Sequence, residues 1–275
     1  MQVSFVKMQG AGNRIVVIDE RASGREPPPA SVIQRLGSSA EGPGFDQLMW
    51  LGPAVDSDHI ASYRVFNADG SEVEQCGNGV RCVARLIAGQ DGASQLCFES
   101  PAGPIAARVL DDQRISVNMG PPQFDPGRIP FVADAQSVSY NLDVDGEIIR
   151  VAVLSMGNPH CVLDVDDVHT APVARLGPLL ECHARFPACA NVGFMHVRGR
   201  DSIELRVYER GVGETLACGT GACAAVVAGQ LQGRLDADVT VQLPGGQLMV
   251  SWAGAGAPVW LTGDAEWISE GTIEL

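Results

Sequence analysis

The sequence contains Cys76-Gly77-Asn78-Gly79 and, 142 positions later, Cys218-Gly219-Thr220-Gly221. Other segments of the 275-residue chain repeat in the same order at offsets of 142 to 145 positions. The matched positions are Gly12-Asn13 with Gly157-Asn158, Gln47 with Asn191, Arg64 to Asn67 with Arg206 to Glu209, Glu72 with Glu214, Pro101 with Pro244, and Gly120 with Gly263. An ordered series of matches at a near-constant spacing indicates an internal duplication.

Each half has the same predicted order of secondary structure. A strand, at 62–67 or 202–209, leads to the Cys-Gly segment, and an apolar helix follows at 79–88 or 221–231. Short strands joined by tight turns come next, at 98–100, 105–110 and 115–119 in the first half and at 239–243, 247–252 and 259–262 in the second. The pattern predicts an α+β fold of two pseudo-symmetric lobes, each a mostly antiparallel sheet around a central helix, with the active site between the lobes.

The predicted lobes comprise residues 1–120 and 121–263, and the C-terminal tail at 264–275 is expected to return to the first lobe. Pro121-Pro122, followed by Pro126-Gly127, has the composition of a linker. Residues 23–30 include three consecutive prolines and are expected to form an exposed loop.

Composition excludes several classes of protein. The 33 acidic residues outnumber the 19 basic ones, and a formal charge of −14 argues against nucleic acid or an anionic membrane as a partner. No apolar run reaches the roughly 18 residues that span a bilayer. The N-terminus alternates apolar and polar residues like a strand and lacks the apolar stretch of a secretory signal, which favours the cytoplasm.

The lysine and cysteine content limits the cofactors. The only lysine is Lys7, which lies in the predicted first strand, so a Schiff base with pyridoxal phosphate is not expected. The eight cysteines include no Cys-x-x-Cys pair, so neither a metal site nor a disulfide framework is predicted. Most of them are expected to be small buried hydrophobic residues.

Cys76 and Cys218 differ from the other cysteines because each lies at the start of a predicted helix. Backbone N–H groups at a helix N-terminus are not paired within the helix and carry partial positive charge, so they stabilise a thiolate or bind an anion. Two such helix ends brought together by a duplicated fold predict two opposed thiols beside a carboxylate. One thiolate would take an α-proton while the other thiol delivers a proton to the opposite face. The alternative is that both cysteines only pack at helix starts, but their equivalent places in both halves favour catalysis.

The first cysteine motif lies in a longer segment, Asn67-Ala68-Asp69-Gly70-Ser71-Glu72-Val73-Glu74-Gln75-Cys76-Gly77-Asn78-Gly79-Val80-Arg81, which resembles the signature of the diaminopimelate epimerase family. Further similar segments cover the whole chain: Lys7-Met8, Gly10 to Asn13, Asp46-Gln47, Met156 to His160, and Glu209-Arg210-Gly211 through Gly221. The resemblance implies a cofactor-independent epimerase that interconverts LL- and meso-diaminopimelate for lysine and peptidoglycan synthesis. It also implies two pseudo-symmetric α+β lobes.

The resemblance also implies roles for individual residues. Cys76 and Cys218 would be the acid/base thiols, and His160 and Glu209 would tune their protonation. The N–H groups of Gly77, Asn78, Gly219 and Thr220 would hold the reacting carboxylate. The other end of the substrate would be bound by Asn67, Asn158, Asn191, Glu209 and Arg210, with Asn13 and Gln47 lining the pocket. Arg210 is suited to pair with a carboxylate through two bonds, and Glu209 to accept from an ammonium.

The chain departs from the family pattern at four positions. Gln9 stands where the family usually has histidine, and Arg14-Ile15 where it has Asp-Phe. Arg14 adjoins Asn13 and reverses a charge, so it bears on recognition of the distal end of the substrate. The family is implied to form a homodimer supported by a tyrosine near the C-terminus, and Ser269 stands at that place.

Three other functions remain open at this point. The first is a racemase or epimerase of another amino acid on the same two-thiol scaffold, which Arg14 leaves room for. The second is a metal-binding or redox module, against which the absence of residues at metal-ligand spacing counts. The third is a non-catalytic paralogue, against which the cysteines retained in both halves count.

Overall fold

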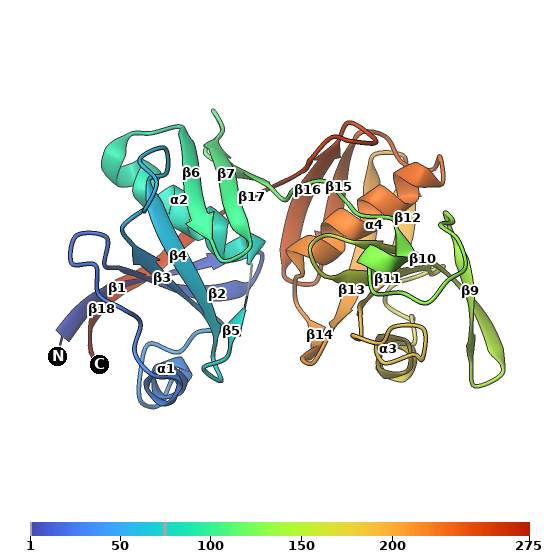
Figure 1. Cartoon of the computed structure of the whole chain (residues 1–275), viewed down its shortest axis with the longest axis horizontal. Coiled ribbons are helices and arrows are strands. Elements are labelled where there is room, and N and C mark those ends of the chain that lie inside the picture. The colour runs from blue at the N-terminus through green and yellow to red at the C-terminus, as the bar shows by residue number, and fades with distance from the viewer. Residues whose placement is uncertain (1, 74–75) are drawn as a thin grey trace. The chain divides into compact units, whose positions relative to one another are not determined.

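The computed structural model describes residues 2–73 and 76–275, and the chain forms two compact units (Figure 1). The first unit comprises residues 1–118 and 262–275, and the second comprises 119–261. Glu74 and Gln75, which belong to the segment that resembles the family signature, lie outside the described residues. Each unit is a sheet with one long helix against one face and a short helix against the other.

The strands of the first unit form a mixed sheet. Their bounds are β1 (Gln2–Gly10), β2 (Asn13–Asp19), β3 (Gln47–Gly52), β4 (Ala61–Asn67), β5 (Glu72–Val73), β6 (Gln95–Ser100), β7 (Gly103–Val109), β8 (Ile115–Asn118) and β18 (Glu266–Glu274). β1 pairs antiparallel with both β18 and β2, β2 pairs parallel with β3, and β3 pairs antiparallel with β4. β4 then pairs parallel with β6, which continues antiparallel through β7 to β8. The last strand therefore lies beside the first (Figure 1).

The second unit repeats this order of strands. Its strands are β9 (Tyr140–Val144), β10 (Glu147–Ser155), β11 (Pro159–Asp164), β12 (Asn191–Gly199), β13 (Ser202–Glu209), β14 (Gly213–Thr215), β15 (Asp238–Leu243) and β16 (Gly246–Trp252); β17 (Val259–Gly263) crosses the division between the units. The parallel pairs β11–β12 and β13–β15 correspond to β2–β3 and β4–β6.

The duplication is preserved in the strand register. Ile15 on β2 lies opposite Gln47 on β3, and His160 on β11 lies opposite Asn191 on β12. These are the positions that the sequence repeat matches, at offsets of 145 and 144. The α+β fold of two similar, mostly antiparallel halves is therefore confirmed.

The long helices are α2 (Gly77–Asp91) and α4 (Gly219–Leu231). α2 contacts β1, β2 and β3 as well as β7 and β8, so the sheet curls around it. In α4 every residue from Gly221 to Gly229 is buried, as an apolar surface on all sides requires. A Cβ on Gly79 would collide with the sulfur of Met49 on β3, so this glycine lets the helix approach the sheet. In the described part of the chain, no helix is long and apolar enough to cross a membrane.

Two short helices, α1 (Ala30–Gly37) and α3 (Val173–Glu181), were not predicted from the sequence. Each lies in the crossover between the parallel strands, β2–β3 or β11–β12. Ile33 and Leu36 of α1 form a buried cluster with Val16 and Ile18 of β2. Because α2 and α1 cover opposite faces, the four residues 15–18 are all buried instead of alternating.

Several predicted boundaries differ from the structure. Both long helices begin two residues earlier than predicted, directly after the cysteine. The loop predicted at 23–30 is present up to Pro29, and the Trp50 indole donates to the Arg25 carbonyl at 2.8 Å. The linker prediction is wrong for Pro126-Gly127, because Pro126 is buried in the second unit and begins a 3-10 helix, η1 (Pro126–Arg128). The Asp125 carboxylate caps that helix by accepting from the Gly127 amide at 3.0 Å.

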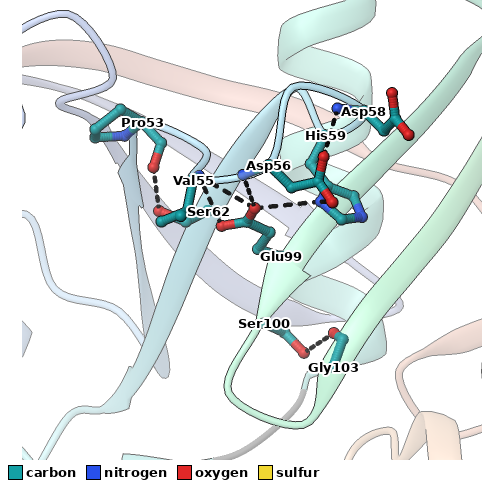
Figure 2. A network of polar contacts seen from close by, with 9 residues as sticks. All are labelled: Pro53, Val55, Asp56, Asp58, His59, Ser62, Glu99, Ser100 and Gly103. Atoms are coloured by element: carbon teal, nitrogen blue, oxygen red, sulfur yellow. Dashed lines mark hydrogen bonds and ion pairs between the residues drawn. The ribbon is translucent and has the colours of Figure 1, made fainter.

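The loop between β3 and β4 is held by one carboxylate on β6 (Figure 2). Glu99 accepts from the backbone N–H groups of Val55 and Asp56 and contacts the His59 ring at 3.2 Å. The bonds from the two amides lower the pKa of Glu99. The charged carboxylate thus fixes a loop that has no apolar core of its own.

Candidate active site

Cys76 and Cys218 occupy the same structural position in their units. Each is the N-cap of its helix, with extended backbone before the first turn. The sulfur of Cys76 accepts from the Gly79 amide at 3.2 Å, and the sulfur of Cys218 accepts from the Gly221 amide at 3.4 Å. Both residues are buried, with 9% and 5% of their surface exposed. The helix N-terminus therefore acts directly on each sulfur and favours its thiolate.

The first two amides of each long helix are the proposed carboxylate donors. They belong to Gly77, Asn78, Gly219 and Thr220, and an α-helix offers these positions no acceptor of its own. The side chain of Asn78 is engaged in the fold, since its Oδ1 accepts from Nη2 of the buried Arg81 at 2.7 Å. Arg81 Nε in turn donates to the Asp264 carbonyl at 3.2 Å. This bond ties the start of α2 to the segment that leads into β18.

Three amide side chains form a chain across β2, β3 and β4. Asn13 Nδ2 donates to Gln47 Oε1 at 3.3 Å, and Gln47 Nε2 donates to Asn67 Oδ1 at 3.2 Å. Asn67 Nδ2 donates onward to Ser71 Oγ at 3.1 Å. Among the described residues, Oδ1 of Asn13 is buried and has no hydrogen-bond partner. A buried acceptor without a donor is costly, so this oxygen is suited to a ligand N–H.

A second polar chain leads to the sulfur of Cys218. The His160 Nε2 donates to Asn158 Oδ1 at 3.0 Å, with the ring proton assigned to that nitrogen. Asn158 Nδ2 donates to Thr220 Oγ1 at 3.4 Å, and that hydroxyl lies 3.5 Å from the sulfur. Burial, and then the positive charge of Arg210, lower the pKa of His160 to about 3. The imidazole is therefore neutral near pH 7, and it orients Asn158 without contributing a charge.

Glu209 acts on Cys218 electrostatically. Burial raises the pKa of Glu209, while Thr215 Oγ1 donates to its carboxylate. Burial first, and then the negative charge of Glu209, raise the pKa of Cys218 well above its usual value. These effects outweigh that of the helix N-terminus, so Cys218 carries its proton at neutral pH.

Asn191 is the first residue of β12, and Arg210 directly follows the last residue of β13. Asn191 Nδ2 donates to the Pro159 carbonyl, and Asn191 Oδ1 accepts from the Arg210 amide, both at 3.1 Å. The exposed guanidinium of Arg210 donates one bond to the Ala188 carbonyl at 3.1 Å. The strand register thus places Asn158, Asn191, Glu209 and Arg210 at one end of the second sheet.

Sequence reasoning missed several residues that support the site. Thr215 donates to Glu209, Ser71 accepts from Asn67, and Arg81 holds Asn78. The repeat offers no signal for them, because Thr215 is matched with Val73 and Arg81 with Cys223. Within residues 2–73 and 76–275, no three His, Cys, Asp or Glu side chains are grouped to hold a metal ion.

The comparisons with known proteins point to one family. The profile of the family described as diaminopimelate epimerase matches residues 5–125 and 152–268. A diaminopimelate epimerase of Laribacter hongkongensis is 53% identical and one of Alkalilimnicola ehrlichii is 50% identical, each over 100% of both chains. This chain belongs to the diaminopimelate epimerase family.

Two solved structures with low sequence identity to this chain have a similar fold. A hydroxyproline epimerase from Agrobacterium vitis superposes with a TM-score of 0.69 at 17% identity and covers 99% of this chain and 91% of its own. A PhzF-family phenazine biosynthesis protein from Bacillus anthracis superposes with a TM-score of 0.71 at 16% identity and covers 100% of both chains.

Arg14, which departs from the family pattern, forms an ion pair with Asp46. Its Nη2 lies 2.6 Å from Asp46 Oδ1, and its backbone amide donates to Asp46 Oδ2 at 2.8 Å. Both side chains are about half exposed, at 49% and 42%. The positive charge next to Asn13 is therefore balanced by a carboxylate that precedes Gln47. Ile15 is fully buried in β2, and Gln9 donates to Glu266.

We expect Arg14→Gln to change kcat/KM for diaminopimelate by less than about fivefold, because an exposed ion pair contributes roughly 0–1 kcal/mol. Arg14→Asp places two carboxylates together and is expected to lower both the melting midpoint and kcat/KM. The exchanged pair Arg14→Asp with Asp46→Arg should recover both. Steady-state kinetics and thermal unfolding of the variants measure this, and a loss of activity in Arg14→Gln would place Arg14 in substrate recognition.

Proposed function

We propose that this chain interconverts LL- and meso-2,6-diaminopimelate without a cofactor, through Cys76 and Cys218 as two bases. The observation that carries the proposal is the equivalent placement of these cysteines as N-caps of the central helices of two duplicated units. Inversion of a stereocentre requires proton removal on one face and delivery on the other, and a duplicated thiol meets that requirement. The product serves lysine and peptidoglycan synthesis.

The chemistry assigns different starting roles to the two sulfurs. Cys218 is protonated at neutral pH, since burial and Glu209 raise its pKa. We therefore assign Cys218 as the acid and Cys76 as the base for the substrate isomer that binds while Cys218 is protonated. The Cys76 thiolate takes the α-proton while the Cys218 thiol delivers its proton to the opposite face. For the reverse reaction the proton starts on Cys76.

The reacting carboxylate gains negative charge as the α-proton leaves. The amides of Gly77, Asn78, Gly219 and Thr220 begin two helices, where the helix dipole favours an anion. We place that carboxylate at these amides because preorganised N–H groups stabilise developing charge without rearrangement.

The distal amino-acid head is assigned to the polar residues at the strand ends. Arg210 and the amides of Asn158 and Asn191 offer donors for a carboxylate, and Glu209 and Asn67 offer acceptors for an ammonium. Asn13 and Gln47 complete the pocket in this proposal. The buried Asn13 Oδ1, which has no partner among the described residues, is suited to accept from the ammonium.

We also propose a homodimer that works in the cytoplasm. Trp267 and Ile268 on β18 are 51% and 47% exposed, and their neighbours on both faces of the strand are exposed as well. Exposed apolar side chains on a strand favour an interface between copies, even with Ser269 in place of the family's tyrosine. Sedimentation of the chain beside Trp267→Glu tests this, and equal sizes would argue against β18 as the interface.

The test of the function is α-hydrogen exchange in deuterated water, with purified chain and no added cofactor. LL-diaminopimelate, meso-diaminopimelate and single amino acids, including proline and glutamate, form the substrate panel. Exchange and epimerisation limited to diaminopimelate support the proposal. Turnover of a single amino acid instead would make this an epimerase of another substrate, and no exchange with any member would exclude the two-base mechanism.

A further inference from the structure

A pair of thiols in the second unit lies outside the proposed catalytic residues. Cys182 follows the last residue of α3, and Cys189 lies two residues before Asn191, the first residue of β12. Their sulfurs are 2.9 Å apart. Cys182 is exposed and Cys189 is half-buried, so small solutes reach the pair.

The backbone holds these sulfurs together. The Ala190 amide donates to the Glu181 carbonyl at 3.0 Å, which joins the two ends of the loop beside the cysteines. The Cys189 amide donates to the Phe186 carbonyl at 2.9 Å and closes a turn. Phe186 is buried, with its ring 4.8 Å from that of Phe131, so the middle of the loop is anchored in the core. The two thiols therefore remain neighbours without any large motion of the chain.

The geometry points to a redox-modifiable dithiol: Cys182 and Cys189 form an intramolecular disulfide when they meet a low-molecular-weight disulfide such as oxidised glutathione. A disulfide requires the sulfurs to approach to about 2.05 Å, a shift of less than about 1 Å from their present separation. The site is separate from Cys76 and Cys218, so the inference does not depend on the proposed epimerase activity.

The exchange proceeds in two balanced steps. The Cys182 thiolate attacks one sulfur of oxidised glutathione, breaks its S–S bond and releases one glutathione thiolate. The Cys189 thiolate then attacks the Cys182 sulfur of this mixed disulfide, forms the Cys182–Cys189 bond and releases the second glutathione. Two electrons pass from the protein to the oxidant, and the two thiol protons end on the two glutathione molecules.

The disulfide would close a ring that supports the substrate end of the unit. The Ala188 carbonyl, which accepts from the Arg210 guanidinium, lies within the eight residues 182–189. The Glu181 carboxylate accepts from the Gly211 amide at 2.6 Å just outside the ring. Oxidation therefore fixes the segment that positions Arg210, and we expect it to raise the melting midpoint of the second unit.

The experiment treats the full chain with oxidised glutathione at pH 8.5, because the hydrogen bond to Cys189 raises the pKa of Cys182 to about 11 and slows exchange at lower pH. It is run on the native chain and on a Cys76→Ser, Cys218→Ser background, in which the proposed catalytic thiols cannot contribute. We expect the loss of two free thiols and a Cys182–Cys189 cross-link in peptide mapping. The midpoint should rise by about 5 °C and return on reduction.

Matched variants make the outcome decisive. Cys182→Ser and Cys189→Ser should each abolish the cross-link and the rise in midpoint, whereas Cys97→Ser, at a half-buried cysteine of the first unit, should leave both unchanged. A glutathione adduct that stays on Cys182 would overturn the inference, as would a pair that remains reduced or a cross-link to another cysteine. A cross-link without a rise in the melting midpoint would overturn the inference that the disulfide stabilises this loop.

Discussion

Cys76→Ser and Cys218→Ser are each expected to lower kcat for diaminopimelate by about 10²–10⁴-fold, the range that a general acid or base contributes. Serine is the sharper substitution, because both sulfurs cap their helices by accepting from the Gly79 and Gly221 amides. A hydroxyl keeps that cap but is too weak an acid to exchange the α-proton. The measurement is the α-hydrogen exchange assay combined with thermal unfolding.

The controls separate chemistry from folding. Cys76→Ala and Cys218→Ala should be equally inactive but less stable by about 0.5–2 kcal/mol, the usual cost of losing an N-cap acceptor. Cys82→Ala, Cys97→Ala and Cys223→Ala should keep most activity, since none of these residues caps a helix. A serine variant at either cap that retains near-normal turnover would remove the two-base mechanism.

Arg210→Lys is expected to lower kcat/KM for diaminopimelate by roughly ten- to a hundredfold, mainly through KM. Lysine keeps the charge but loses the planar fork that binds a carboxylate through two bonds. It also loses the guanidinium bond to the Ala188 carbonyl. The assay compares diaminopimelate with an analogue in which the distal carboxylate is an amide.

A selective effect is the diagnostic result for Arg210. The native chain should prefer the carboxylate substrate strongly, and Arg210→Lys should lose most of that preference. Arg175→Lys, at an exposed arginine paired with Glu147 in the same unit, should change nothing. An equal loss on both substrates would show that Arg210 acts through the fold alone.

The sequence by itself determined the duplication, the fold class and the places of the two central cysteines. Repeated segments survive in both halves, and a short Cys-Gly motif before an apolar helix is a local pattern that needs no distant contacts to be recognised. The strand register at Gln47 and Asn191 agrees with the repeat for the same reason, since pairing follows the order of elements. The longer resemblance added candidate roles for the residues around these cysteines.

The ends of elements and the short helices could be assigned only from tertiary structure. α1 and α3 are only eight and nine residues long, and isolated helices of that length are marginal. They persist because they cover the outer faces of parallel strand pairs, as Ile33 and Leu36 do over Val16 and Ile18. The burial of Pro126 likewise depends on packing within the second unit and not on its local sequence.

The electrostatics of the site also depend on contacts between residues distant in the sequence. Asp46 balances Arg14 across 32 positions. Burial, together with Glu209 at Cys218 and Arg210 at His160, shifts the pKa of each group so that both are uncharged near pH 7. Cys182 and Cys189 become a redox pair only because the Glu181 to Ala190 bond and the buried Phe186 fold their loop back. The sequence shows which residue types are present and how far apart they lie along the chain. The pKa of a group and the distance between two thiols depend on packing and burial, which only the folded chain decides.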